Sequence, residues 1–290
     1  MSTIYLSGGI GNQLFQVGFG HYLNLKLGER IVLQKPKLRS GLPHTHLSFF
    51  EKEFSCIHCI HKIHQGNVYV NELRNPWNSK AKGLSLRSTL DYRTQPFISP
   101  FEMKDPKKYE NFLGYFQNLA FIRPVEGILL DEIHEVLSKR TEIELKIGLL
   151  ENTEVIHVRQ GDTNSIKNKK RVGILSPTFY RRLLGKRTSF QRRLVVTDDI
   201  AGAREVLHGI TVDYIYGPDE LDPWETLALM AKSKRLITAN STLSWWGGFL
   251  ALANEAEVII PKPFFINLEL ETNGALRYPG FSEFKSEFAE

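Results

Sequence analysis

Short apolar runs alternate with longer mixed stretches along the second half of the chain. The runs are "EVIHV" (154–158), "RLVVT" (193–197), "VDYIY" (212–216), "RLITA" (235–239) and "EVIIP" (257–261). Each has the length of a buried strand, and strands that alternate with helices form a parallel sheet. Helix punctuation agrees, because Ser176-Pro177 and Asp222-Pro223 can each open a helix and Gly209 follows a predicted one over about 201–208. The pattern predicts a Rossmann-like α/β domain.

The first 35 residues predict one more unit of the same kind. Strand "TIYLS" leads through loop "GGIGN" into a helix over about 12–26 that ends at Gly28, and strand "RIVLQ" follows. Residues 36–121 show no sustained period, and 125–150 is predicted to be a helix that joins two halves. We therefore expect an N-terminal domain over 1–150 and a C-terminal domain over 151–290.

The net charge and the first residues of the chain narrow the class of protein. Thirty-seven Lys and Arg against 32 Asp and Glu give a net charge of +5, which suits anionic ligands but is weak for a nucleic-acid binder. The start "MSTIYLSGGIG" lacks the pattern of a signal peptide, and no window holds about 18 consecutive apolar residues. These features predict a soluble, cytoplasmic protein with at most peripheral membrane association.

Two cysteines lie in "CIHCIHKIH" (56–64), together with three histidines. Zinc sites usually combine two ligand pairs separated by a loop, whereas all these side chains fall in one short stretch. We interpret the segment as packed surface and expect no metal site.

Polar residues gather where three of the predicted strands end. His157, Arg159 and Asp162 follow the first strand of this half, and Asp198 lies in "TDD" (197–199) after the second. The fourth is followed by Asn240, Ser241 and Thr242. One such cluster would be ordinary, but the carboxyl ends of parallel strands converge at one edge, where ligands bind. Three clusters at one edge predict a ligand site.

The stretch "NSTLSWWGG" (240–248) has the features of a phosphate site. Asn240 or Ser241 can cap the helix that follows, so its remaining N–H groups and positive dipole end can receive an anion. Arg159 could add a bidentate fork to the same phosphates. The aromatic residues Trp245, Trp246 and Phe249 are predicted to be core, because one face of this helix must cover the sheet.

The loop "GGIGNQ" (8–13) follows a strand and opens a helix, as a dinucleotide fingerprint does. Leu14 replaces the third glycine, and no acid follows the second strand, so a nicotinamide-dependent oxidoreductase is the weaker alternative. A non-catalytic nucleic-acid binder is weaker still, since no basic helix or aromatic platform is evident. The loop can bring Gly9 and Gly11 close to an anionic group, with Asn12 and Gln13 as donors.

Six motifs together resemble glycosyltransferase family 11, the α-1,2-fucosyltransferases. They are "GGIGNQLFQ" (8–16), "GYFQN" (114–118), "IHVRQGD" (156–162), "TDD" (197–199), "WETLALM" (224–230) and "ITANSTLSWWGGFLA" (237–251). They occur in the order typical of the family and span nearly the whole chain.

The resemblance implies a GT-B-like fold of two Rossmann-like domains facing a cleft. It implies GDP-L-fucose as donor, bound mainly by the C-terminal domain. The acceptor would be the 2-hydroxyl of a galactose-containing oligosaccharide or lipid-linked glycan, entering from the N-terminal domain. Transfer would invert the anomeric centre without a metal or other cofactor. Arg159 would hold the donor phosphates with Ser241 and Thr242, and His157 would lie beside the nucleotide.

Two positions depart from the family pattern. Gln160 stands where a second arginine is usual, which leaves a related donor such as GDP-colitose open. Thr226 stands where relatives commonly place an aspartate, so Glu225 is the candidate carboxylate for guanine. Asp162 is the first candidate for the catalytic base, and orienting Arg159 or the loop is its alternative role.

Overall fold

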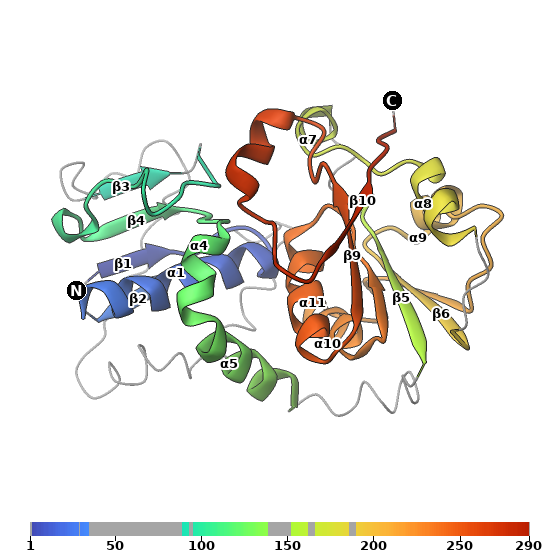
Figure 1. The fold of residues 1–290 in the computed structure, drawn as a ribbon, viewed down its shortest axis with the longest axis horizontal. Coiled ribbons are helices and arrows are strands. Elements are labelled where there is room, and N and C mark those ends of the chain that lie inside the picture. The colour runs from blue at the N-terminus through green and yellow to red at the C-terminus, as the bar shows by residue number, and fades with distance from the viewer. Residues whose placement is uncertain are drawn as a thin grey trace. The chain divides into compact units, whose positions relative to one another are not determined.

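The computed structural model divides the chain into two compact units, Met1–Val136 and Leu137–Glu290. The structure describes residues 2–28, 30–34, 89–92, 95–138, 152–161, 166–185 and 190–289. The predicted domain boundary between 150 and 151 and the cysteine-rich segment 56–64 lie outside these ranges, so both stay predictions. Each unit is an α/β structure with a parallel sheet (Figure 1).

Among its described residues, the N-terminal unit holds a four-stranded sheet in the order β2-β1-β4-β3, with every neighbouring pair parallel. Its strands are β1 (Ser2–Tyr5), β2 (Ile31–Gln34), β3 (Thr89–Tyr92) and β4 (Asn111–Gly114). Its helices are α1 (Ile10–Leu27), α4 (Leu119–Ile122) and α5 (Glu126–Ser138), with short 3₁₀ turns at Pro106–Lys108 and Arg123–Val125.

Helix α1 ends as the sequence predicts. Gly28 adopts φ of +65°, and its N–H donates to the carbonyl of Asn24, which is a left-handed C-cap. The core beneath α1 is aromatic, since the Phe19 and Phe116 rings stack with centroids 3.8 Å apart and Phe121 meets Phe19 edge-on. Strands β3 and β4 were not predicted, because four-residue strands are too short to show a period.

The C-terminal unit holds a six-stranded parallel sheet in the order β10-β9-β8-β5-β6-β7. Its strands are β5 (Thr153–Val158), β6 (Arg192–Thr197), β7 (Tyr214–Tyr216), β8 (Arg235–Ile237), β9 (Glu257–Lys262) and β10 (Ser282–Lys285). Its helices are α7 (Ile166–Arg171), α8 (Pro177–Leu184), α9 (Ile200–Val206), α10 (Pro223–Lys232) and α11 (Thr242–Ala253), and a 3₁₀ segment, η5, spans Leu268–Gly274. All five predicted strands are present, so the predicted α/β class is confirmed.

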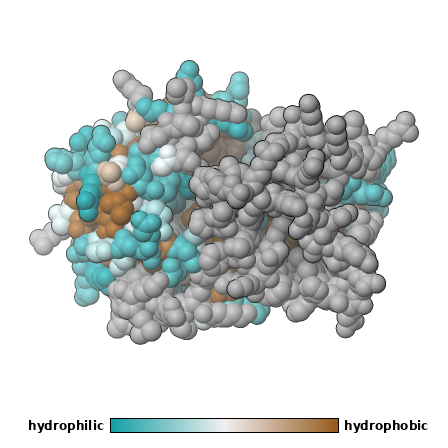
Figure 2. Space-filling view, turned by 180° about the vertical axis from the view of Figure 1, so that it is seen from behind, coloured by the Kyte–Doolittle hydropathy of each residue, from teal (hydrophilic) through white to brown (hydrophobic). Residues whose placement is uncertain are grey.

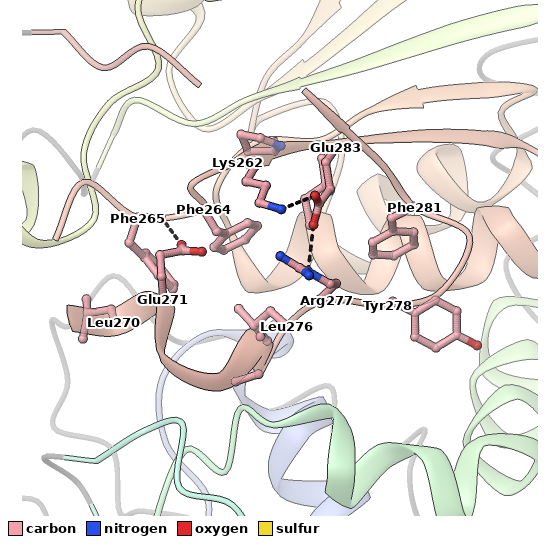
Figure 3. Close-up of a pocket in the computed structure, with 14 residues that line it drawn as sticks. Lys262, Phe264, Phe265, Leu270, Glu271, Leu276, Arg277, Tyr278, Phe281 and Glu283 are labelled. Carbon is pink, nitrogen blue, oxygen red and sulfur yellow. Dashed lines mark hydrogen bonds and ion pairs between the residues drawn. The ribbon is translucent and has the colours of Figure 1, made fainter. Parts of the chain in front are cut away.

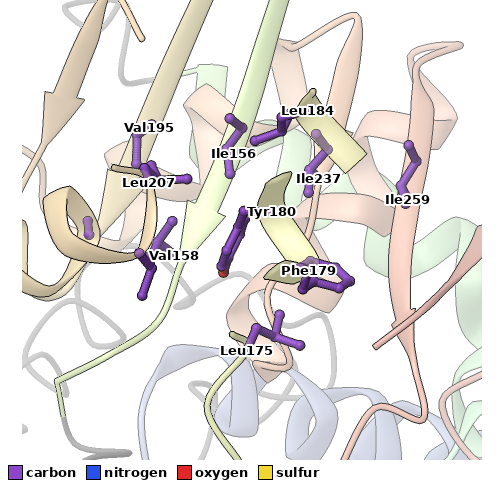
Figure 4. Close-up of a cluster of buried hydrophobic side chains, with 12 residues drawn as sticks. Ile156, Val158, Leu175, Phe179, Tyr180, Leu184, Val195, Leu207, Ile237 and Ile259 are labelled. Carbon is purple, nitrogen blue, oxygen red and sulfur yellow. The ribbon is translucent and has the colours of Figure 1, made fainter. Parts of the chain in front are cut away.

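Helices cover both faces of this sheet (Figure 1). On one face, Phe179 and Leu184 of α8 pack with Ile156 and Val195 of the central strands (Figure 4). On the other face lie α10 and α11, and α11 buries Trp245, Trp246 and Phe249 almost completely, which confirms their predicted place in the core. Since successive strand residues point to opposite faces, His157 shares a face with Val155, away from α8.

Each sheet has a point where the strand order reverses. In the C-terminal unit the chain runs from β5 outward through β6 to β7 and then crosses to β8, which pairs with the other edge of β5. In the N-terminal unit the corresponding point lies between β1 and β4. Open parallel sheets bind ligands at such switch points, beyond the carboxyl ends of the strands. The fold therefore predicts ligand crevices beyond β5 and β8 and beyond β1 and β4.

Few large hydrophobic side chains of the described residues reach solvent. On the face drawn in Figure 2 the coloured surface is mostly hydrophilic, and its most compact hydrophobic group lies near the left edge. None of the helices in the described part of the chain combines the length and hydropathy needed to cross a bilayer.

Candidate active site

The loop that leaves β5 is held by one carboxylate. Asp198, which follows β6, accepts hydrogen bonds at Oδ1 from the backbone N–H groups of Gln160, at 2.8 Å, and Gly161, at 3.1 Å. Its Oδ2 pairs with Nε of Arg159 at 3.2 Å, and both side chains are about a quarter exposed. Three contacts to one side chain fix both the loop and the direction of the guanidinium.

Gly161 is required by this close approach. A Cβ at that position would lie 2.8 Å from Asp198 Oδ2 and 3.1 Å from its carboxyl carbon, closer than side chains pack. The glycine of the "HVRQGD" motif therefore makes room for the carboxylate. Asp162 itself lies outside the described residues, and its role as base or orienting group stays a prediction.

His157 is buried in the sheet beside this loop, with 2% of its surface exposed. Its Nδ1 has no hydrogen-bond partner among the described residues. Burial, followed by the positive charge of Arg159, lowers the His157 pKa from 6.5 to about 4, although Asp198 opposes the shift. At neutral pH the imidazole is therefore uncharged, so it can hydrogen-bond a ligand but adds no positive charge.

The start of α11 lies at the predicted edge. Ser241 occupies the N-cap position, but its side chain makes no capping hydrogen bond. Ser241 and Thr242 are half-buried, and the Ser244 hydroxyl in the first turn instead accepts from the N–H of Ala239 at 2.9 Å. The positive end of this 12-residue helix thus follows β8, the strand next to β5 in the sheet.

Asn240 does not cap α11, although the sequence allows it to, and its predicted contact with the donor stays a prediction. Its amide Nδ2 donates to the carbonyls of Val172 and Gly173, at 3.0 and 2.9 Å, and the residue is almost fully buried. It joins the start of α11 to the segment after α7. The amide therefore positions the loop, and the side chain does not cap the helix.

Glu225 is part of a capping box. Asp222 Oδ1 accepts from the N–H groups of Trp224 and Glu225, at 2.7 and 2.8 Å, while Glu225 Oε2 accepts from the N–H of Asp222 at 2.8 Å. This arrangement confirms the predicted start of α10 and shows what one oxygen of Glu225 does. Guanine recognition by Glu225 stays a prediction.

The glycine-rich loop, the second candidate site, lies within the N-terminal unit at the switch point of its sheet. Gly9 is the N-cap residue of α1 and Gly11 is buried in the first turn. Gln13 Nε2 donates to the Gly8 carbonyl at 2.7 Å, and Asn12 Oδ1 accepts from Gln117 Nε2 at 2.7 Å. The predicted donors thus also hold the loop itself.

Sequence reasoning missed Gln16 as the residue that ties this loop to β4. Its Oε1 accepts from the N–H of Ser7 at 2.9 Å, and its Nε2 donates to the Gly114 carbonyl at 2.7 Å. Gln16 and Gly114 belong to "GGIGNQLFQ" and "GYFQN", which the sequence shows as separate motifs. Their joint role is a buried hydrogen-bond network between β1 and β4.

The described residues contain no group of three or more His, Cys, Asp or Glu side chains arranged for a metal ion. Of the "TDD" motif, Asp198 holds the loop after β5, while Asp199 caps α9 through the N–H of Gly202 at 3.1 Å. Both carboxylates of the motif therefore make contacts within the protein, and donor binding by Asp198 stays a prediction.

Comparison with known proteins identifies the chain at the level of family. The model of glycosyl transferase family 11 matches residues 91–270, more than half of the chain. The O-antigen biosynthesis glycosyltransferase WbnK of Escherichia coli is 25% identical, with 90% of this chain and 93% of the relative covered. An α-1,2-colitosyltransferase of Escherichia coli is also 25% identical, with 92% and 93% covered.

Among solved structures, the fucosyltransferase NodZ from Bradyrhizobium matches with a TM-score of 0.43 and 11% identity, covering 86% of this chain and 92% of that one. The oxidoreductase alternative finds no support in these matches. The motifs of the sequence, the sheet that presents them and the match over residues 91–270 agree, and the chain belongs to glycosyl transferase family 11.

Proposed function

We propose that the chain transfers L-fucose from GDP-L-fucose to the 2-hydroxyl of a galactoside, forming an α-1,2 linkage with inversion. The observation that carries the proposal is the position of Arg159. It leaves β5 at the switch point of the sheet, Asp198 fixes its guanidinium, and the neighbouring strand β8 leads into the N-terminus of α11. A fixed cation and a helix dipole at one edge suit a diphosphate.

These groups suit the chemistry of an inverting transfer. The acceptor oxygen forms a bond to the anomeric carbon as the bond from that carbon to the β-phosphate oxygen breaks, so negative charge grows on the leaving diphosphate. A preorganised cation stabilises that charge more in the transition state than in the ground state. Arg159 and the start of α11 would supply this stabilisation without a metal ion.

The proton of the acceptor hydroxyl needs a base. Asp162 is the first candidate, and the neutral imidazole of His157 fits a position beside the nucleotide, where it can donate or accept a hydrogen bond. Ser241, Thr242 and the loop at Gly9 and Gly11 would complete the donor contacts.

A second donor is favoured by one comparison. The relative named an α-1,2-colitosyltransferase matches over nearly its whole length. Gln160 also replaces the second arginine usual in fucosyltransferases of the family. GDP-colitose is therefore the alternative donor, with the same linkage and the same residues in the same roles.

The test is a product assay. We expect purified protein, incubated with GDP-L-fucose or GDP-colitose and a β-galactoside, to form a glycoside whose mass increases by one deoxyhexosyl or dideoxyhexosyl residue, respectively. Linkage analysis should place the new sugar on the galactose 2-hydroxyl. Transfer from an ADP-sugar or UDP-sugar alone, or transfer to another hydroxyl, would overturn the proposal.

A further inference from the structure

A cavity of about 320 Å³ lies within the C-terminal unit. None of the residues assigned above to the candidate donor site lines it. The end of β9, the segment η5 and the start of β10 enclose it (Figure 3). Its size falls at the lower end of the range for small-molecule sites.

One wall of the cavity is polar, and its charges cancel. Glu283 pairs through Oε1 with Arg277 Nε at 2.9 Å and through Oε2 with Lys262 Nζ. Glu271, also at the cavity, accepts from the N–H of Phe265 at 2.7 Å. Two cations facing two carboxylates give no excess charge for an anion, so a phosphate would have to displace Glu283. Hydroxyl groups, in contrast, can donate to the carboxylates and accept from the cations.

The other walls are apolar. Phe264 and Leu276 are buried, with Leu270 and Phe281 beside them (Figure 3). The polar residues remain open to solvent, with 45% of Lys262, 61% of Arg277 and 32% of Glu283 exposed. A ligand entering here would place apolar C–H groups against the hydrocarbon wall and hydroxyls against the charged one. A neutral pyranose ring has both surfaces.

The cavity wall is fixed to the helix of the predicted donor site. Trp245 Nε1 donates to the Leu276 carbonyl at 2.7 Å, and its ring contacts those of Tyr278 and Phe281, with centroids 6.0 and 6.1 Å away. Trp245 lies one turn into α11, which begins at Thr242 after the N-cap residue Ser241. The cavity and the predicted phosphate site thus share one rigid element.

We propose that this cavity binds a neutral hexopyranose of the acceptor glycan, beyond the galactose that receives the transferred sugar. The proposal rests on the proposed transferase function and adds a subsite that selects extended acceptors. Arg277 and Glu283 hydrogen-bond the hydroxyls, and Phe264 and Phe281 pack against the ring.

The test compares acceptors of increasing length in cavity variants. Initial rates are measured with methyl β-galactoside and with a β-galactosyl trisaccharide for wild type, Arg277→Ala and Glu283→Gln. The control is Arg182→Ala, which removes another exposed arginine of the same unit, paired with Glu287 at 3.5 Å. Thermal unfolding and the KM for the GDP-sugar check that each variant is folded and binds donor.

We expect KM for the trisaccharide to rise about tenfold in both cavity variants, the loss expected for one hydrogen bond to a charged group. KM for methyl β-galactoside, kcat and the control should stay at wild-type values. Unchanged KM for the trisaccharide, or an equal rise for both acceptors, would overturn the subsite.

Inorganic phosphate, tested as an inhibitor of wild type competing with the trisaccharide, distinguishes an anion site. Competitive inhibition of wild type that is relieved in Arg277→Ala would show that the cavity takes an anion and would overturn the saccharide proposal. No turnover by wild type with any GDP-sugar would instead contradict the proposed function, so the two failures are distinguishable.

Discussion

Asp198 joins three parts of the loop after β5: the Arg159 guanidinium and the backbone N–H groups of Gln160 and Gly161. Arg159 can stabilise a leaving diphosphate only if its planar group is held in one direction, because catalysis depends on donors placed before the reaction. We therefore expect Asp198 to act as a positioning residue. Its contribution should appear in turnover more than in folding.

Replacing Asp198 by Asn should reduce kcat by at least about tenfold. The amide oxygen can still accept the two backbone hydrogen bonds, but the neutral group no longer pairs with Arg159. Initial rates and thermal unfolding of the same samples measure the effect. Asp213→Asn is the control, since Asp213 Oδ2 also accepts a backbone N–H, that of Arg193 at 2.6 Å, near the start of β6. A rate for Asp198→Asn within twofold of wild type would contradict the positioning role.

His157 should make the protein less stable in acid. Its folded-state pKa of about 4 lies below the usual 6.5, so the unfolded chain binds more protons between these values and stability falls as pH falls through that window. The full loss is roughly 3 kcal/mol, by the free energy of one pKa unit. Denaturant unfolding at pH 7 and pH 4.5 should show a smaller loss for His157→Gln than for wild type. Equal losses in the two proteins would exclude His157 as the cause.

At the scale of elements, the sequence predicts the C-terminal sheet well and the N-terminal sheet in part. β5 to β9 have apolar runs bounded by helix caps, whereas β10, with the sequence "SEFK", has no apolar run to predict it. The candidate site was likewise predictable only in part. Arg159 and Ser241 could be assigned to strand ends, but the clamp by Asp198 depends on register, which pairs Val158 with Thr197. Parallel strands are joined by a crossover rather than by a tight turn, so no turn fixes their register and this pairing could not be derived from the sequence alone.

The capping box of α10 allows the two roles of Glu225 to be separated. In Glu225→Gln the amide oxygen can still accept from the N–H of Asp222, so the melting temperature of the free protein should change little. A carboxylate that accepts from two guanine N–H groups would, however, be lost. We expect the ratio of the Kd for ADP to the Kd for GDP, measured by calorimetric titration, to fall about tenfold, which corresponds to about 1.4 kcal/mol. An unchanged preference would leave Glu225 as a capping residue only.

For the whole molecule, two sheets of the same kind each carry a motif loop at their switch points. In the C-terminal unit the Arg159 guanidinium is positively charged and the N-terminus of α11 is the positive end of a helix dipole. Both groups favour a diphosphate, so GDP should stabilise the protein. GDP at about 100 times its dissociation constant should add about 2.7 kcal/mol if it binds only the folded state. Thermal unfolding with GDP, ADP and NAD checks this. Equal shifts with ADP would contradict guanine selection.

The rate of sugar transfer by wild type, Arg159→Lys and Arg159→Ala, each with and without EDTA, tests the proposed role of Arg159 directly. Lysine keeps the charge but loses the planar fork that Asp198 orients, so turnover should fall by about a hundredfold or more, and alanine should reduce it further. Wild-type transfer should survive EDTA, because in the proposed mechanism Arg159 and α11 take the place of a divalent ion. Near-wild-type turnover in Arg159→Ala, or a loss in EDTA that manganese restores, would contradict that mechanism.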